Sequence, residues 1–281
     1  MKITIVGLGL IGGSYALSLK KRMEGLTIYG WDENLDHLKQ AAGLGIVDVP
    51  CDSLSHAVKS GDTIFLAIPV HTIEELLPDL LHLLNENQCM VDFGSTKKAI
   101  CNSVGGHPKR NQFIAAHPIS GTEYSGPAAA FDSLFEDKVM IVCEQEKADQ
   151  VFVDTFRKQC KALGMSTTYL SAEEHDIHLA YVSHLSHIIS FGLSKTVLDK
   201  EEDESKILDL AGSGFASTVR LAKSSPEMWT PIFLKNKEAV LESLTHYQGR
   251  LSEFKDLLVN SDEAGINKYL EEGRAIRKIL E

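Results

Sequence analysis

The sequence Met1-Lys2-Ile3-Thr4-Ile5-Val6-Gly7-Leu8-Gly9-Leu10-Ile11-Gly12 decides the fold of this chain. An apolar run typical of a buried strand stops at a Gly-x-Gly-x-x-Gly pattern, and a helical pattern continues from there. A second apolar run, 26–31, ends at Asp32. Strand, glycine turn, helix, second strand and terminal acid together form the fingerprint of a dinucleotide-binding unit.

Each part of this fingerprint has a physical reason. Gly7 permits a tight turn, Gly9 lets a pyrophosphate approach the backbone, and Gly12 lets the helix pack closely on the strand. The helix N-terminus then offers free N–H groups to the phosphates. A carboxylate at Asp32 accepts a hydrogen bond from a ribose 2′-hydroxyl and repels a 2′-phosphate. Residues 33–36 contain no arginine that would bind such a phosphate. The sequence therefore predicts NAD rather than NADP as the cofactor.

The composition is that of an acidic globular protein. The 281 residues include 28 Lys and Arg against 39 Asp and Glu, a net charge of −11. This charge argues against nucleic acid or an anionic membrane as a partner. The five cysteines form no Cys-x-x-Cys pair and indicate reduced thiols. No apolar stretch reaches about eighteen residues, so we expect no transmembrane helix, and Met1 opens directly into a strand, so we expect no signal peptide. These features predict a cytoplasmic enzyme.

Strands and helices alternate through the first 170 residues. Further strands are predicted at 62–68, 89–93, 113–116, 139–143 and 166–170. The alternation is typical of a Rossmann-type α/β fold, a doubly wound and mostly parallel sheet, whose ligands bind at the carboxyl ends of the strands. The residues predicted to bind the cofactor along that edge are Gly7, Leu8, Gly9, Leu10, Ile11, Gly12, Asp32, Ile68, Pro69 and Ser95.

Beyond about residue 170 only helical patterns remain. We expect a Rossmann domain over 1–170 and an all-helical domain over 171–281. An acidic run at 201–204 is predicted to be a solvated loop. The predicted helices are 172–199, 204–210, 216–223, 226–248, 249–259 and 262–280.

The helix 172–199 carries four histidines, which raises the question of a metal site. At 100° per residue, His184 and His187 should point to the side opposite His175 and His178, so the four could not share one ion. No His-Glu-x-x-His motif joins them. We expect no metal.

Three polar residues could act on a substrate. His117 follows the strand 113–116 on the ligand edge and suits a general base, since the pKa of histidine is about 6.5; the alternative is a histidine bonded to backbone. Ser95 ends the neighbouring strand and could also cap the helix that follows. Arg220 lies after a glycine turn in a chain of negative charge, where it could bind a carboxylate or remain solvated surface.

Six motifs in order along the chain resemble the prephenate/arogenate dehydrogenases of tyrosine synthesis. They are Gly7-Leu8-Gly9-Leu10-Ile11-Gly12, Asp92-x-Gly94-Ser95-x-Lys97, His117-Pro118-Ile119-x-Gly121-Thr122-Glu123-x-Ser125-Gly126, Val182-Ser183-His184-Leu185-x-His187, Gly214-Phe215-x-x-x-x-Arg220 and Met228-Trp229-x-x-Ile232-Phe233-Leu234-x-Asn236-Lys237. The resemblance covers residues 1 to about 245 and therefore both predicted domains.

The resemblance implies a reaction and a set of roles. Hydride passes from a cyclohexadienol ring to NAD, the hydroxyl loses its proton, and carbon dioxide leaves as the ring becomes aromatic. It implies that His117 accepts the proton and that Ser95 orients His117 and the substrate. Arg220 and His187 would hold substrate carboxylate or carbonyl oxygens. Thr122 and Glu123 match positions at the mouth of the pocket.

The resemblance leaves several points open. Ser186 stands where relatives usually have proline, which could change how His187 is aimed. Relatives are homodimers formed through the helical domain, so we expect a homodimer. The chain matches neither a mutase fusion nor a regulatory domain, so inhibition by tyrosine would act at the active site. Prephenate and arogenate differ only by a keto or an amino group, and no residue decides between them.

Two other functions remain as alternatives. A β-hydroxyacid dehydrogenase would share the fingerprint, but that class uses a Lys-x-x-x-Asn pair where this chain has His184-x-x-His187. A non-catalytic NAD sensor would need no base, so the combination of His117, Ser95 and Arg220 argues against it.

Overall fold

The computed structural model describes residues 1–204 and 206–279 and is built on one eight-stranded sheet. The strand order is β3-β2-β1-β4-β5-β6-β7-β8. All neighbours pair in parallel except β6 and β7, which are antiparallel. The strands are β1 (Lys2–Val6), β2 (Thr27–Trp31), β3 (Val49–Pro50), β4 (Thr63–Leu66), β5 (Cys89–Asp92), β6 (Phe113–Ile119), β7 (Val139–Cys143) and β8 (Ser166–Leu170). The predicted Rossmann-type, mostly parallel sheet is confirmed.

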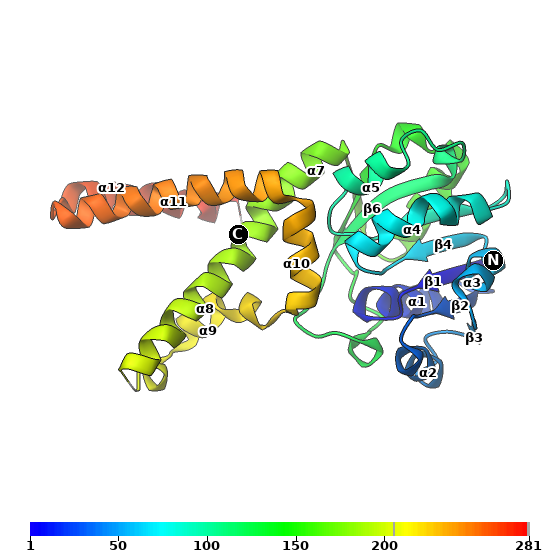
Figure 1. Cartoon of the computed structure of the whole chain (residues 1–281), viewed down its shortest axis with the longest axis horizontal. Helices are drawn as coiled ribbons and strands as arrows, with labels where there is room; N and C mark the ends of the chain where they lie inside the picture. Colours follow the sequence, from blue (N-terminus) through cyan, green and yellow to red (C-terminus); the bar gives the residue numbers. More distant parts are fainter. Residues whose placement is uncertain (205, 280–281) are drawn as a thin grey trace.

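Helices cover both faces of this sheet (Figure 1). One apolar cluster lies between the sheet and α1, α2 and α6, and a second lies between the sheet and α3, α4, α5 and α7. The bounds of these helices are α1 (Leu10–Arg22), α2 (Leu35–Gly43), α3 (Leu54–Ser60), α4 (Val70–Leu83), α5 (Lys98–Ser103), α6 (Gln150–Ala162) and α7 (Ala172–Leu179).

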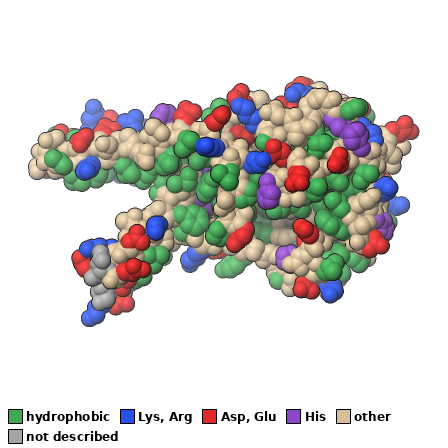
Figure 2. Space-filling model, viewed as in Figure 1, with side chains coloured by type: hydrophobic (Ala, Val, Ile, Leu, Met, Phe, Trp, Pro, Cys, Tyr) green, Lys and Arg blue, Asp and Glu red, His purple; other side chains and the backbone are tan. Residues whose placement is uncertain are grey.

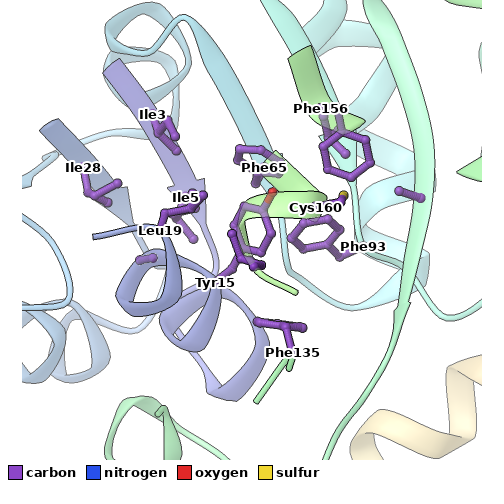
Figure 3. Packing of buried hydrophobic residues seen from close by; sticks show 14 of the residues in the cluster. Ile3, Ile5, Tyr15, Leu19, Ile28, Phe65, Phe93, Phe135, Phe156 and Cys160 are labelled. Carbon is purple, nitrogen blue, oxygen red and sulfur yellow. The ribbon is translucent and has the colours of Figure 1, made fainter. Parts of the chain in front are cut away.

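Alternation along the strands explains the two cores. Ile3 and Ile5 of β1 belong to the first cluster, whereas Val6 of the same strand belongs to the second, because successive side chains point to opposite faces. The first cluster is rich in aromatic rings, and the Tyr15 ring lies 4.6 Å from Phe65 between their centroids (Figure 3).

The described chain after α7 is mainly helical and extends away from the sheet as two arms (Figure 1). One arm is α8, and the other is formed by α11 and α12; α10 lies between the arms and the sheet. No described helix is both long and apolar enough to cross a bilayer. The elements are the π-helical segment η4 (Ala180–His184), α8 (Leu185–Asp203), η5 (Leu208–Leu210), α9 (Ser213–Thr218), η6 (Arg220–Lys223), α10 (Pro226–Lys235), α11 (Lys237–Val259), α12 (Glu263–Arg274) and η7 (Ala275–Lys278).

Several expected boundaries were wrong, and long-range contacts account for most of them. The strand predicted to end at residue 116 continues to Ile119, because β7 pairs with it through this part. The acidic run was predicted to be a loop, but α8 includes residues 201–203. The predicted helix 226–248 breaks at Asn236, whose side-chain amide is held by Asp176 O, and α11 runs unbroken across the predicted boundary at 248. In the predicted helix 262–280, the described helical turns end at Lys278, and residue 280 lies outside the described chain.

Candidate active site

The glycine turn between β1 and α1 leaves room for a ligand at one position only. Gly7 has φ +91°, and a Cβ there would clash with the Ala67 carbonyl oxygen. A Cβ at Gly12 would clash with the carbonyl oxygen of Gly7. At Gly9, in contrast, a Cβ would meet nothing within 4 Å. The turn therefore has two glycines required by packing and one that leaves open space, as a pyrophosphate against the backbone requires.

The start of α1 completes a cradle for phosphate. Gly9 is the N-cap of α1, and no described side chain caps this helix or places an acid in its first turn. Asp32 follows β2 directly, and its Oδ2 accepts a hydrogen bond from Leu8 N at 2.8 Å. Its Oδ1 accepts one from Asn34 N at 2.9 Å. Asp32 thus holds the glycine turn in place, and the residues present fit a dinucleotide.

The other predicted cofactor residues surround this turn. Leu8 is buried, while Leu10 and Ile11 are partly exposed at the start of α1. Ile68 and Pro69 follow β4, and Pro69 is the exposed N-cap of α4. The structure brings these residues to the carboxyl edge of the parallel strands, where ligands of such sheets bind.

His117 stands at the same edge and is the first member of a buried polar array. Its Nδ1 lies 2.9 Å from Nε2 of His175, and Nδ1 of His175 lies 2.7 Å from Oδ1 of Asp176. His175 is fully buried, whereas His117 is partly exposed. Burial, followed by the neighbouring His175, holds the pKa of His117 well below its usual value. His117 is therefore a neutral imidazole near neutral pH, the form that can accept a proton.

A buried ion pair fixes the backbone beside His117. Lys97 and Asp92 are both fully buried, and the Lys97 ammonium contacts the Asp92 carboxylate and donates to Ala116 O at 2.8 Å. Asp92 also accepts from Gly94 N at 3.0 Å. Burial raises the pKa of the Asp92 carboxyl, and the nearby Lys97 opposes that change. The pair ties the end of β5 to the residue before His117.

Ser95 is not the N-cap that its position allowed. The helix α5 begins at Lys98, and the Asp176 carboxylate caps it by accepting from Lys97 N at 2.7 Å and Lys98 N at 2.9 Å. Asp176 comes from α7, so a residue from the helical part of the chain takes the role expected of a local serine. Ser95 lies partly exposed in the β5–α5 turn.

Residues of the helical part and of the β6–β7 loop meet at the mouth of the site. Arg220 Nη1 lies 3.9 Å from Glu123 Oε2, and the Arg220 side chain is 55% exposed. Such a long, exposed pair is weak, so the guanidinium can bind another anion. His187 stacks on Trp229 with 3.6 Å between ring centroids. The indole Nε1 of Trp229 is buried without a hydrogen-bond partner in the described chain.

Thr122 and His187 have local hydrogen bonds. Thr122 Oγ1 accepts from Tyr124 N at 3.3 Å in the β6–β7 loop. His187 Nδ1 lies 3.0 Å from Ser183 O, an oxygen that can only accept, so Nδ1 carries the proton. Burial lowers the pKa of His187, and Arg220 lowers it further.

The expectation that His184 points away from His175 was wrong. The helix predicted to be continuous contains the π-helical segment η4, whose wider turn changes the 100° step on which that expectation rested. His184 is buried and contacts Asn236 Nδ2, which also donates to Asp176 O at 2.7 Å. Burial lowers the pKa of His184 to about 4, and Asp176 and His175 lie near enough to influence it.

The structure thus brings most predicted site residues together and adds others. His117 joins Thr122 and Glu123 through β6 and its loop, and Arg220 and His187 approach from the helical part. The roles of a second set of residues beneath them were not predicted from the sequence. Two sequence features could have pointed to these residues: an aspartate and a lysine near one strand end, and a histidine next to an aspartate near the start of a helix. These residues are Asp92, Lys97, His175, Asp176, Trp229 and Asn236.

Comparison with known proteins gives a consistent result. Residues 15–168 match the family model "Prephenate dehydrogenase, nucleotide-binding domain", and residues 171–272 match "Prephenate dehydrogenase, dimerization domain". A prephenate dehydrogenase of Bacillus subtilis is 31% identical over 277 residues, covering 98% of this chain and 75% of that protein.

Two solved structures are similar over the whole chain. One is the prephenate dehydrogenase of Aquifex aeolicus in complex with hydroxyphenyl propionate and NAD+, at 32% identity and a TM-score of 0.92, covering 100% of this chain and 98% of that one. Another is the arogenate dehydrogenase of Synechocystis, at 27% identity and a TM-score of 0.80, covering 100% of both chains.

Proposed function

The chain belongs to the prephenate dehydrogenase family, and we propose that it converts prephenate to 4-hydroxyphenylpyruvate by NAD-dependent oxidative decarboxylation. The observation that carries this reaction is the placement of a neutral His117 at the cofactor edge of the sheet. Arg220 approaches the loop that follows His117 from the helical part. A base and a carboxylate-binding cation therefore face one region from two sides.

The cofactor is NAD, held by the glycine turn and Asp32. The open space at Gly9 and the uncapped start of α1 accept the pyrophosphate, and the Asp32 carboxylate accepts from the ribose. We propose that Leu8, Leu10, Ile11, Ile68 and Pro69 line this site. Bound NAD supplies the acceptor for the hydride that leaves the substrate ring.

His117 takes the proton that the substrate hydroxyl loses. The C–O bond gains double-bond character as hydride leaves, so the hydroxyl becomes acidic and a neutral imidazole can remove its proton. Ser95, in the neighbouring strand-end turn, positions the hydroxyl and the His117 ring. Loss of carbon dioxide follows because the ring becomes aromatic.

The carboxylate and the side-chain oxygen of the substrate contact residues at the mouth of the site. Arg220 binds a carboxylate, which suits a planar guanidinium whose contact with Glu123 is long and exposed. His187 contacts a side-chain oxygen, and Thr122 and Glu123 close the mouth. Trp229 Nε1 has no hydrogen-bond partner among the described residues, which supports this assignment, since a buried N–H donor needs an acceptor.

Arogenate is the second candidate substrate. The Glu123 carboxylate lies at the mouth, only weakly paired with Arg220, and could bind the ammonium that arogenate carries in place of the keto group. The similarity to the Synechocystis arogenate dehydrogenase also favours this alternative.

We further propose a homodimer formed through the helical part of the chain. The family model for this part is named a dimerization domain. Figure 2 shows hydrophobic side chains along the side of the α11–α12 arm that faces α8. Large contiguous apolar surfaces of this kind mark interfaces. The exposed apolar residues of α11 and α12 include Leu241, Leu251, Leu258, Val259 and Leu270.

The remaining proposals concern organisation and regulation. We divide the chain into a cofactor domain, 1–170, and a substrate and dimerisation domain, 171–281. Five buried, unpaired cysteines support a reducing cytoplasmic location. Tyrosine, which shares the hydroxyphenyl ring of the product and carries an amino group in place of its keto group, would inhibit by binding at the active site.

The test is an assay of NADH or NADPH formation with prephenate and arogenate, each with NAD and NADP. We expect turnover of prephenate with NAD. The His117→Ala variant should keep NAD affinity and lose roughly 10²–10⁴-fold in kcat, the usual contribution of a general base. Turnover of arogenate alone would select the second substrate. Inactivity with all four pairs despite NAD binding would instead favour a β-hydroxyacid dehydrogenase or a sensor.

A further inference from the structure

The array beneath His117 has a defined direction of hydrogen bonding. Two backbone N–H groups, those of Lys97 and Lys98, donate to the two oxygens of the Asp176 carboxylate, and Nδ1 of His175 lies 2.7 Å from one of these oxygens. Asp176 is 3% exposed, so its carboxylate meets protein groups rather than water. An ionised carboxylate only accepts hydrogen bonds, so the Asp176 oxygens are the acceptors of this array.

The protons of both imidazoles follow from that carboxylate. Nδ1 of His175 must carry a hydrogen, because the Asp176 oxygen accepts from it. Burial lowers the pKa of His175, so the ring is neutral and its Nε2 has a lone pair. The atom 2.9 Å from that lone pair, Nδ1 of His117, must then be the donor. Nε2 of His117 is left without a proton.

We propose that Asp176 and His175 are positioning residues that hold His117 in its Nδ1–H tautomer, so that Nε2 is the base. This inference rests on the proposed function for its catalytic meaning, since Nε2 must receive the substrate's hydroxyl proton. The tautomer itself is a property of the protein alone.

The array also stabilises the charge that catalysis creates. When the substrate O–H bond breaks and an Nε2–H bond forms, His117 becomes a cation. Its Nδ1 proton can shift to Nε2 of His175, which places the positive charge against the Asp176 carboxylate. One proton enters the array in each turnover and later leaves to solvent. The orienting role resembles that of the aspartate in a Ser-His-Asp triad, with a second imidazole between base and acid.

The other charged and titratable groups near the array have partners of their own. Lys97 lies close enough to lower the pKa of both His117 and His175, but its ammonium is paired with Asp92. His184 approaches from η4 and is held by Asn236. Asp176 is therefore the carboxylate that bonds directly to the array.

Two variants predict opposite tautomers. In Asp176→Asn, the side-chain amide can donate to Nδ1 of His175, which moves the His175 proton to Nε2 and forces His117 into its Nε2–H form. In His175→Gln, the amide oxygen can accept from Nδ1 of His117 and preserve the wild-type tautomer. A merely structural role would not reverse the proton in one variant and keep it in the other.

The tautomer is read from long-range ¹H–¹⁵N spectra of histidine-labelled protein, with the His117 signals assigned by their absence in His117→Ala. We expect the Nδ1–H form in the wild type and in His175→Gln, and the Nε2–H form in Asp176→Asn. We expect kcat of Asp176→Asn to fall roughly 10²–10⁴-fold, with a smaller change in KM and a shifted pH profile of kcat.

A matched control is Asp149→Asn, which alters a carboxylate that caps α6 through Val151 N at 2.9 Å but has no histidine partner in the described chain. It should leave the His117 tautomer and kcat unchanged. An Nε2–H tautomer in the wild type, or an Asp176→Asn variant with unchanged tautomer and kcat, would overturn the proposal. If Asp176→Asn does not fold, the wild type and His175→Gln still decide it. Because the spectra need no substrate, inactivity of the wild type would refute the proposed function separately.

Discussion

Replacing Lys97 by methionine tests whether the buried ion pair supports the active site. Methionine keeps most of the apolar length of the side chain but removes the ammonium. The change leaves the Asp92 carboxylate buried without its cation and Ala116 O without the donor now 2.8 Å away. Both losses occur next to His117.

The size of the effect follows from complete burial of both partners. Breaking a buried pair by removing one partner costs about 3–5 kcal/mol, because the remaining charge is uncompensated. The pKa of Asp92 is already raised by burial and should rise further in the variant. The folded state then binds more protons at Asp92 than the unfolded state does, so the stability of the variant falls as the pH rises. The stability that the variant loses relative to the wild type should therefore be smaller near pH 5.5 than at about pH 8.

The assay is urea denaturation of wild type, Lys97→Met and Lys98→Met, with kcat measured on each. Lys98 is the matched control, since it is the next residue and its 2.8 Å pair with Glu173 is exposed. Solvent screens that exposed pair, so its loss should change stability little. The double variant Asp92→Asn/Lys97→Met should recover most of the lost stability, because the amide oxygen of the new side chain can still accept from Gly94 N and no buried charge remains.

Two results would refute this reasoning. One is a Lys97→Met variant within about 1 kcal/mol of the wild type, which is the range of an exposed pair. The other is a double variant as unstable as the sum of its single changes, since residues in direct contact should couple.

Three further predictions follow from the site. Arg220→Ala should lose about 2–3 kcal/mol of transition-state stabilisation in kcat/KM, as for a hydrogen bond to a charged group. Arg157→Ala, which removes an exposed arginine of α6, serves as the control. Equal kcat/KM values for the two variants would mean that Arg220 is a surface residue that binds no substrate. Asp32→Asn keeps an acceptor for Leu8 N but removes the charge, so the preference for NAD over NADP should narrow by roughly tenfold, about 1.4 kcal/mol; an unchanged ratio of the two kcat/KM values would place the ribose elsewhere. Burial lowers the pKa values of His117, His175, His184 and His187, so the unfolded state binds protons that the folded state does not, and stability should fall as pH drops below about 6.5. For His184, with a pKa of about 4, the loss is about 3 kcal/mol, and a His184→Gln variant with an equally steep acid dependence in urea denaturation would contradict this value.

The sequence determined the architecture because its signals are local. The backbone at Gly7, the start of α1 and the position of Asp32 after β2 depend on neighbours within a few residues. Alternation of strands and helices then places the ends of the parallel strands at one edge of the sheet. His117 and Ser95 were predicted in this way, whereas Arg220 was predicted from its position after a glycine turn in an acidic chain and from the resemblance to the family.

The tertiary structure alone decided what supports those residues. Asp176 caps α5 across 79 positions of sequence, so Ser95, which could have capped that helix, does not do so. His175 meets His117 across 58 positions. Neither separation matches the period of a helix or a strand, so no sequence pattern could reveal these two contacts. They depend on how a whole helix docks against a sheet.

The π-helical segment η4 shows the same division. The sequence correctly indicated a helix around His184, since helical propensity and apolar periodicity are properties of short segments. The direction of His184 depends on one wider turn, in a segment where Asn236 joins His184 to Asp176. Local patterns thus specified the elements and the edge that carries the site, whereas long-range packing specified which nitrogen, carboxylate and ammonium meet there, because those contacts exist only once the helical part and the sheet have come together.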